Sequence, residues 1–136
     1  RGLAFNNDGS KMFECGLGES KIYQSTLSTP FDITTATFVN SIDSQDPQPR
    51  GIEFSNDGKK LHEIGSTNDK IYQSTLSTPF DITTATFEVS VDSIGTQPTG
   101  LTWNNDGSRL YQVDSAFGVD EIYQSLVSAG GGWEAI

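Results

Sequence analysis

The chain has 136 residues, 34% of them hydrophobic, and a formal net charge of −10. This length suffices for one ordinary domain core, and the acidic balance excludes nucleic acid and anionic membrane surfaces as partners, because both are bound through basic patches. No apolar run is long enough for membrane insertion, and the single cysteine, Cys15, excludes an intrachain disulfide.

An internal repeat organises the chain. The sequence KIYQSTLSTPFDITTATF at 21–38 returns unchanged at 70–87, 49 positions later. A period of this length is typical of propeller blades and of helical arrays. Three units align, at 1–49, 50–98 and 99–136, and the third carries two extra residues between its second and third strands.

Each unit predicts four short strands. Asn7-Asp8-Gly9 between two apolar runs is a hairpin signal, and Pro30 ends the third strand because proline cannot donate to a ladder. Residues 31–35 form a compact connection before a strand rich in β-branched and aromatic residues. In the first unit the strands are expected at 2–5, 11–15, 21–28 and 36–42.

The expected fold class is therefore all-β, a β-propeller segment of four-stranded antiparallel blades. A β-sandwich with an internal duplication is the alternative, although a sandwich gives each strand a different environment. The third blade is expected to be incomplete, with glycines at 130–132 and only residues 133–136 to begin its fourth strand. Propellers close with typically about 4–8 blades, so the ring is completed by self-association, by an open head-to-tail array or by a longer chain. Of these, self-association into a closed ring is favoured.

The repeat resembles a family of tandem β-propeller repeats found in uncharacterised secreted, surface and phage-associated proteins of bacteria and environmental samples. Two stretches carry the resemblance, Arg50-Gly51-Ile52-Glu53-Phe54-Ser55-Asn56-Asp57-Gly58 and the run from Lys70 to Ala85. It covers essentially the whole chain and implies the propeller fold. It implies no particular activity, because propellers host lectins, enzymes and scaffolds alike. The chain departs from the family pattern at two sets of positions, Glu14, Glu63 and Gln112, and Ser25, Ser74 and Ser125.

Two sets of repeated side chains are candidate ligand-binding residues. Glu14, Glu63 and Gln112 fall on the same strand of successive blades, where they would ring the inner region and hold a cation, or line a solvent channel. Paired carboxylates also serve in glycoside hydrolysis, but no motif places these near a substrate. The second set repeats an aromatic in each blade and fits either a carbohydrate site or a blade core: Tyr23, Tyr72 and Tyr123, accompanied by Phe31, Phe80 and Trp133.

No catalytic or metal-ligating constellation is predicted. The only histidine, His62, occupies a slot that holds Phe13 and Tyr111 in the other blades, so a packing role is expected. The Asn-Asp-Gly turns superficially resemble a calcium loop, but Ala4 and Cys15 stand where an EF-hand needs acidic residues. We therefore expect a protein that is not an enzyme and has no cofactor, with no motif to support calcium.

The predicted function is a non-catalytic module for multivalent binding, with glycans as a candidate ligand, or for adhesion on an extracellular or particle surface. The alternative is a purely structural, self-assembling subunit of a virion, fibre or surface appendage. Homo-oligomers formed through blade edges are expected in either case. The chain begins at Arg1 with neither a methionine nor a signal peptide, which predicts a processed product or a fragment.

Overall fold

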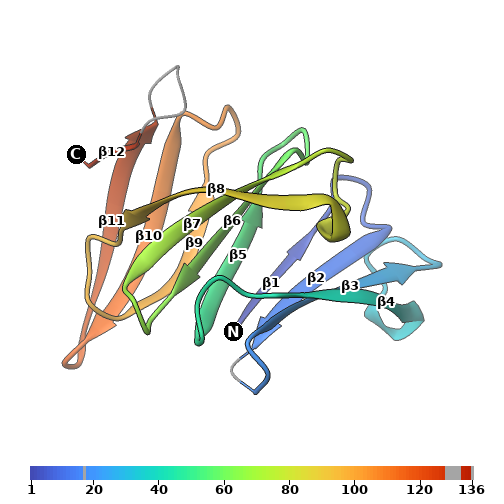
Figure 1. Ribbon diagram of the computed structural model, residues 1–136, viewed down its shortest axis with the longest axis horizontal. Coiled ribbons are helices and arrows are strands. Elements are labelled where there is room, and N and C mark those ends of the chain that lie inside the picture. Colours follow the sequence, from blue (N-terminus) through green and yellow to red (C-terminus); the bar gives the residue numbers. More distant parts are fainter. Residues whose placement is uncertain (17, 128–132, 136) are drawn as a thin grey trace.

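The computed structural model describes residues 1–16, 18–127 and 133–135, and these form three four-stranded antiparallel sheets that lie side by side (Figure 1). In each sheet the strands follow one another in sequence order. Blade 1 contains β1 (Gly2–Phe5), β2 (Lys11–Gly16), β3 (Lys21–Leu27) and β4 (Ala36–Asp43). Blade 2 contains β5 (Pro49–Phe54), β6 (Lys60–Gly65), β7 (Lys70–Leu76) and β8 (Ala85–Asp92). Blade 3 contains β9 (Pro98–Trp103), β10 (Arg109–Ala116), β11 (Val119–Val127) and β12 (Trp133–Ala135).

The predicted all-β blades are confirmed, and the strand bounds of blade 1 differ from the prediction by single residues. Two short 3₁₀ turns, η1 (Ile33–Thr35) and η2 (Ile82–Thr84), are the helical elements of the described chain. The two extra residues of the third unit lengthen the β10–β11 hairpin, whose turn has Phe117 and Gly118 at positive φ. As expected, β12 is short, while residues 130–132 and Ile136 lie outside the described part.

Asp-Gly pairs close the first hairpin of every blade. Asp8 Oδ1 accepts the backbone N–H of Ser10 at 2.9 Å, and Gly9 takes a φ of 71°, which side chains other than glycine rarely adopt. The same bond and the same positive φ recur at Asp57-Gly58 and Asp106-Gly107. These acidic residues therefore act in turns.

The blades meet at their first strands, because β5 contacts both β1 and β9. A Cβ atom on Gly2 would lie 2.7 Å from the Cα of Gly51, and one on Gly51 would lie 3.1 Å from the Cα of Gly100. Only glycine permits so close an approach of two backbones. At the hairpin tips, Asn7 Nδ2 donates to Asn56 O at 2.7 Å, and Asn56 Nδ2 donates to Asn105 O in the same direction.

The hydrophobic core lies between the blades. Blades 1 and 2 share one cluster, in which the rings of Phe13 and Phe54 are 4.4 Å apart. Side chains along β6 point alternately to the two faces of the sheet, so Leu61 packs in this cluster and Ile64 packs in a second, smaller one between blades 2 and 3. Each blade therefore depends on its neighbours for burial. No helix in the described residues is long and apolar enough to cross a membrane.

Candidate functional site

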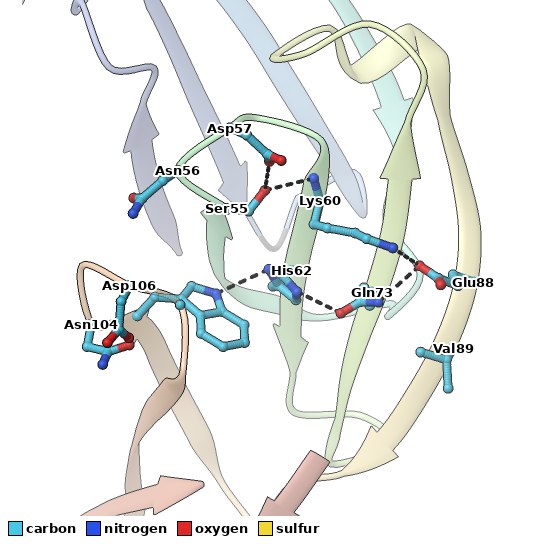
Figure 2. A pocket seen from close by; sticks show the side chains of 12 residues that line it. Ser55, Asn56, Asp57, Lys60, His62, Gln73, Glu88, Val89, Asn104 and Asp106 are labelled. Atoms are coloured by element: carbon cyan, nitrogen blue, oxygen red, sulfur yellow. Dashed lines mark hydrogen bonds and ion pairs between the residues drawn. The ribbon is translucent and has the colours of Figure 1, made fainter. Parts of the chain in front are cut away.

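A pocket of about 620 Å³ lies between blades 2 and 3 (Figure 2). Its volume is in the range of small-molecule sites. Amide, carboxylate and aromatic side chains converge on it from β6, β7, β8, β9 and the two hairpin turns. The lining residues are Ser55, Asn56, Asp57, Lys60, His62, Gln73, Glu88, Val89, Trp103, Asn104, Asp106 and Gly107.

The equivalent space between blades 1 and 2 is filled by the segment that contains η2. Ile82 is fully buried there, and its N–H donates to Gln24 Oε1 at 3.1 Å. The ring of Phe80 covers Gly58 so closely that a Cβ on that glycine would lie 2.3 Å from it. At Gly107, by contrast, no described residue comes within 4 Å of the Cβ position.

Blade 3 has a shorter connection at this point. Ser25 pairs with Phe38, thirteen residues further on, whereas Ser125 pairs with Ala135, only ten residues further on. The sequence Phe-Asp-Ile, which fills the space in the other junction, has no counterpart in this connection. The pocket is thus defined by the described residues, and residues 128–132 of this connection lie outside that part of the chain.

A chain of hydrogen bonds crosses the pocket from blade 3 to the outer strand of blade 2. Trp103 Nε1 donates to His62 Nδ1 at 3.2 Å, so Nε2 carries the imidazole proton and donates to Gln73 Oε1 at 2.9 Å. Gln73 Nε2 then donates to Glu88 Oε2 at 3.0 Å. Figure 2 shows this series ending at the Glu88 carboxylate, where Lys60 Nζ also binds, at 2.5 Å.

Burial and these contacts set the ionisation of the two central groups. Desolvation lowers the pKa of His62 from 6.5 to about 4, which keeps the imidazole neutral near pH 7 and able to accept from the indole. Hydrogen bonds from Lys60, Thr75 and Gln73 lower the pKa of Glu88 to about 2. The hydrogen-bond series across the pocket is therefore neutral near pH 7 up to Gln73 and ends at the ionised carboxylate of Glu88.

The pocket is built where otherwise matching blades differ. His62 replaces the Phe13 of blade 1, and Glu88 replaces Val39 immediately after the verbatim repeat ends at Phe87. Trp103 stands where blade 2 has a phenylalanine. The sequence pattern predicts a packing role for His62 and does not predict Glu88 or Trp103 as site residues. The signal that could have found them was the departure of single residues from an almost exact repeat.

The predicted acidic set occupies three successive blade faces outside this pocket. Glu63 is buried between blades 1 and 2, where its carboxylate accepts the N–H groups of Gln45 and Asp46, each at 3.1 Å, and the Ser44 hydroxyl. Burial raises the pKa of Glu63. Gln112 makes the corresponding bonds between blades 2 and 3, to Ser93 and Ile94. Glu14 lies exposed on the outer face of blade 1.

The predicted tyrosines also lie outside the larger pocket, and each hydroxyl has a partner close by in the sequence. Tyr23 donates to Glu19, and Tyr123 donates to Glu121. Tyr72 is buried, accepts from Asn68 Nδ2 at 3.0 Å and donates to Asp46 Oδ2 at 3.4 Å. Ligand binding by the acidic and tyrosine sets stays a prediction. The Trp133 side chain lies outside the described atoms.

Within the described residues, no group of three or more His, Cys, Asp or Glu side chains is placed to hold a metal ion. Cys15 is buried, and desolvation raises the pKa of its thiol. The larger pocket offers hydrogen-bonding side chains, the Lys60–Glu88 ion pair and aromatic rings.

No family model matches the sequence, and no curated protein matches it. Solved structures do match the fold. A Bacteroides fragilis protein, provisionally described as a 6-phosphogluconolactonase, aligns at a TM-score of 0.75 with 16% identity, over 98% of this chain and 36% of its own. A Lactobacillus plantarum protein aligns at 0.73 with 15% identity, over 98% and 39%. A chain of a nidogen–laminin complex aligns at 0.69 with 20% identity, over 98% and 46%.

These likenesses confirm the predicted β-propeller fold, and at these identities they show the fold alone. The chain spans less than half the length of the proteins it matches. The membership of a particular repeat family stays a resemblance.

Proposed function

We propose that this β-propeller module binds a neutral carbohydrate in the pocket between blades 2 and 3. The observation that carries the proposal is that an indole, three amide side chains and ionised carboxylates line one pocket of about 620 Å³. Sugars present apolar C–H faces that pack on aromatic rings, and hydroxyl groups that both donate and accept hydrogen bonds. Gln73, Asn56 and Asn104 supply amides, and Glu88 supplies a fixed acceptor.

The charges of the pocket favour a neutral ligand over a phosphorylated one. Among the described residues that line the pocket, Lys60 is the only cation, and Glu88 already pairs with it. Asp57 and Asp106 add two further carboxylates at the pocket's edge. A phosphate group would meet uncompensated like charge here, because phosphate sites need arginines, lysines or free backbone N–H groups. The ligand class proposed is thus distinct from the phosphorylated substrate named for the structural neighbour.

The proposed role is binding without catalysis. Both ring nitrogens of His62 are engaged by Trp103 and Gln73, so the imidazole is held rather than presented as a base. The ammonium of Lys60, the hydroxyl of Thr75 and the amide of Gln73 donate to Glu88 and hold it ionised, which is the wrong state for a general acid. Multivalent presentation stays a prediction. The corresponding space between blades 1 and 2 is filled by Ile82, so this pocket is not repeated at that junction.

The test is binding of the purified chain to an array of neutral and phosphorylated glycans, followed by calorimetry with the best ligand. We expect a neutral glycan to bind and Trp103→Ala to weaken it about tenfold or more, because the stacking surface is lost. Phe117→Ala is the matched control, since Phe117 is an exposed aromatic outside the pocket. A preference for phosphorylated sugars, an absence of any glycan bound, or an equal loss in both variants would contradict the proposal.

A second candidate is self-assembly through the two outer blade faces, with a structural role. Leu3 and Ile33 on blade 1 are 56% and 62% exposed, although their blade 2 counterparts, Ile52 and Ile82, are buried. On blade 3, Ile122 is 75% exposed where its blade 1 counterpart is buried. Apolar side chains in these positions favour association. The native mass of the chain over a range of protein concentrations tests this candidate.

A further inference from the structure

The connection between blades 1 and 2 is held by a buried carboxylate. Asp46 is fully buried and accepts three backbone N–H groups: Oδ1 from Gln48 at 2.8 Å and Thr67 at 3.2 Å, and Oδ2 from Asn68 at 3.1 Å. These bonds offset the cost of removing the charge from water. Opposite it stands Gly65, where a Cβ would lie 2.1 Å from the Asp46 carboxyl carbon. The aspartate of the connection thus requires glycine at the end of β6.

The next junction exchanges the two residues. The connection between blades 2 and 3 has Gly95 in the place of Asp46, and β10 has Asp114 in the place of Gly65. Asp114 is buried and accepts the N–H of Gln97 at 2.7 Å, while a Cβ on Gly95 would lie 1.9 Å from its Oδ2. One carboxylate and one glycine therefore occupy each junction, and either side can supply the carboxylate.

The outer face of blade 1 carries the same kinds of residue that, in blade 2, contact the connection between blades 1 and 2. No described segment occupies the corresponding position on blade 1. A pocket of about 530 Å³ lies there, lined by Glu14, Gly16 and Tyr23, the counterparts of Glu63, Gly65 and Tyr72. Glu14 is exposed, and no described residue comes within 4 Å of a Cβ on Gly16. We propose that this pocket is a docking site for an extended Ser-x-Asp-x-Gln-Pro segment carried by another repeat of this type.

The blade 1–2 junction supplies the contacts of the proposed complex. Glu14 accepts the N–H groups of the x and Asp positions and the serine hydroxyl, as Glu63 does with residues 44–46. The aspartate enters the space beside Gly16 and reaches the Tyr23 hydroxyl, as Asp46 reaches Tyr72. Because Gly16 leaves that space open, the blade 1 pocket selects a segment with aspartate over one with glycine. This inference is independent of the carbohydrate pocket.

The exchange of Asp and Gly gives a test with two proteins and two peptides. The peptides are Ser-Gln-Asp-Pro-Gln-Pro, which copies residues 44–49, and Ser-Gln-Gly-Pro-Gln-Pro, which differs only at the aspartate. The proteins are the wild type and Gly16→Asp, with binding followed by amide chemical shifts. The wild type is expected to bind the aspartate peptide about tenfold more tightly, and Gly16→Asp to reverse that preference. The same preference in both proteins, or no shift with either peptide, would overturn the proposal.

Substitutions at Glu14 separate recognition from general adhesion to an apolar edge. Glu14→Gln should keep the aspartate peptide bound, because Gln112 performs this role in blade 3, whereas Glu14→Leu should lose it. Binding that survives Glu14→Leu would contradict the assignment. As a check that needs no added peptide, Asp46→Gly and Gly65→Asp should each lower the midpoint of thermal unfolding, and the double variant should recover it. A double variant no more stable than the singles would refute the exchange rule itself.

Discussion

His62 is an ionisable residue at a position that holds Phe13 in blade 1 and Tyr111 in blade 3. It fills an aromatic slot, as predicted, and its ring lies 4.6 Å from that of Trp103. It also carries the hydrogen-bond series across the pocket, which a phenylalanine could not do. The position was readable from the repeat, but the partners were not. Trp103 lies 41 residues away, and the contact depends on how two blades pack.

Stability should fall in acid because of His62. Its pKa is about 4 in the folded chain and about 6.5 when unfolded, so the unfolded state binds more protons between these values. The free energy of unfolding is therefore expected to decrease as pH falls from 6.5 towards 4, by up to about 1.4 kcal/mol per pH unit from this group. Urea unfolding of the wild type and His62→Phe at several pH values measures it.

The comparison of the two chains isolates the histidine from other groups. Burial raises the pKa of Glu63, which acts in the opposite sense at low pH but is common to both proteins. The His62→Phe chain should lose the histidine part of the slope while keeping the aromatic packing found at Phe13. Identical slopes in the two proteins would show that His62 is not buried and neutral.

Among the elements, the segment from Phe80 to η2 decides whether the space between two blades is filled. Phe80 has a φ of 54°, unusual for a bulky residue, and its N–H donates to Gly58 O at 3.0 Å. Its ring lies over the same glycine and 5.4 Å from the ring of Phe54. The strained backbone is thus held by packing. At the junction between blades 2 and 3, the described residues line a pocket instead.

Alanine substitutions at two equivalent glycines test this account. Gly58 and Gly107 have φ values of 70° and 71°, so alanine costs about 1 kcal/mol of stability at either from backbone strain. Only Gly58→Ala adds a collision with Phe80, so its loss should reach about 3 kcal/mol. The free energies of unfolding from denaturant titrations give both values. Equal losses would mean that Phe80 does not cover Gly58 as described.

The sequence predicted the elements better than their junctions. Alternation, Asp-Gly pairs and prolines placed the strands of blade 1 to within a residue, because these signals are local. Asp46 lies opposite Gly65, and Gly95 lies opposite Asp114; the two residues of each pair are about 19 positions apart in the sequence. No local sequence signal therefore reveals that the aspartate and the glycine change places between the two junctions. The same holds for Glu63, which was singled out as a site residue and hydrogen-bonds the connection between blades.

For the whole molecule, the outer faces of blades 1 and 3 both expose apolar side chains whose counterparts are buried at the internal junctions. We propose that two chains can associate by placing blade 3 of one against blade 1 of the other, since apolar contact is what the internal junctions bury. Two copies would give six blades. A longer chain that supplies further blades would cover the same faces.

Light scattering over a range of protein concentrations tests this association. The wild-type chain should increase in mass with concentration, and Ile122→Glu should weaken association about tenfold or more, because a charge would enter an apolar contact. Phe117→Glu is the control, since Phe117 is 94% exposed at the tip of a hairpin. A discrete dimer indicates a closed ring, and a ladder of masses indicates an open array with a structural role. A monomer at every concentration contradicts self-association.

The asparagine contacts at the hairpin tips give the row of blades a direction. Asn7 donates to blade 2 and Asn56 donates to blade 3, so blade 3 ends the row with an amide that can donate onward, and blade 1 begins it with a carbonyl that can accept. Like faces therefore cannot repeat this contact, and a two-fold axis through the interface is incompatible with it. Any further blade that repeats this contact therefore joins head to tail, with its first strand and hairpin oriented as in the three blades described.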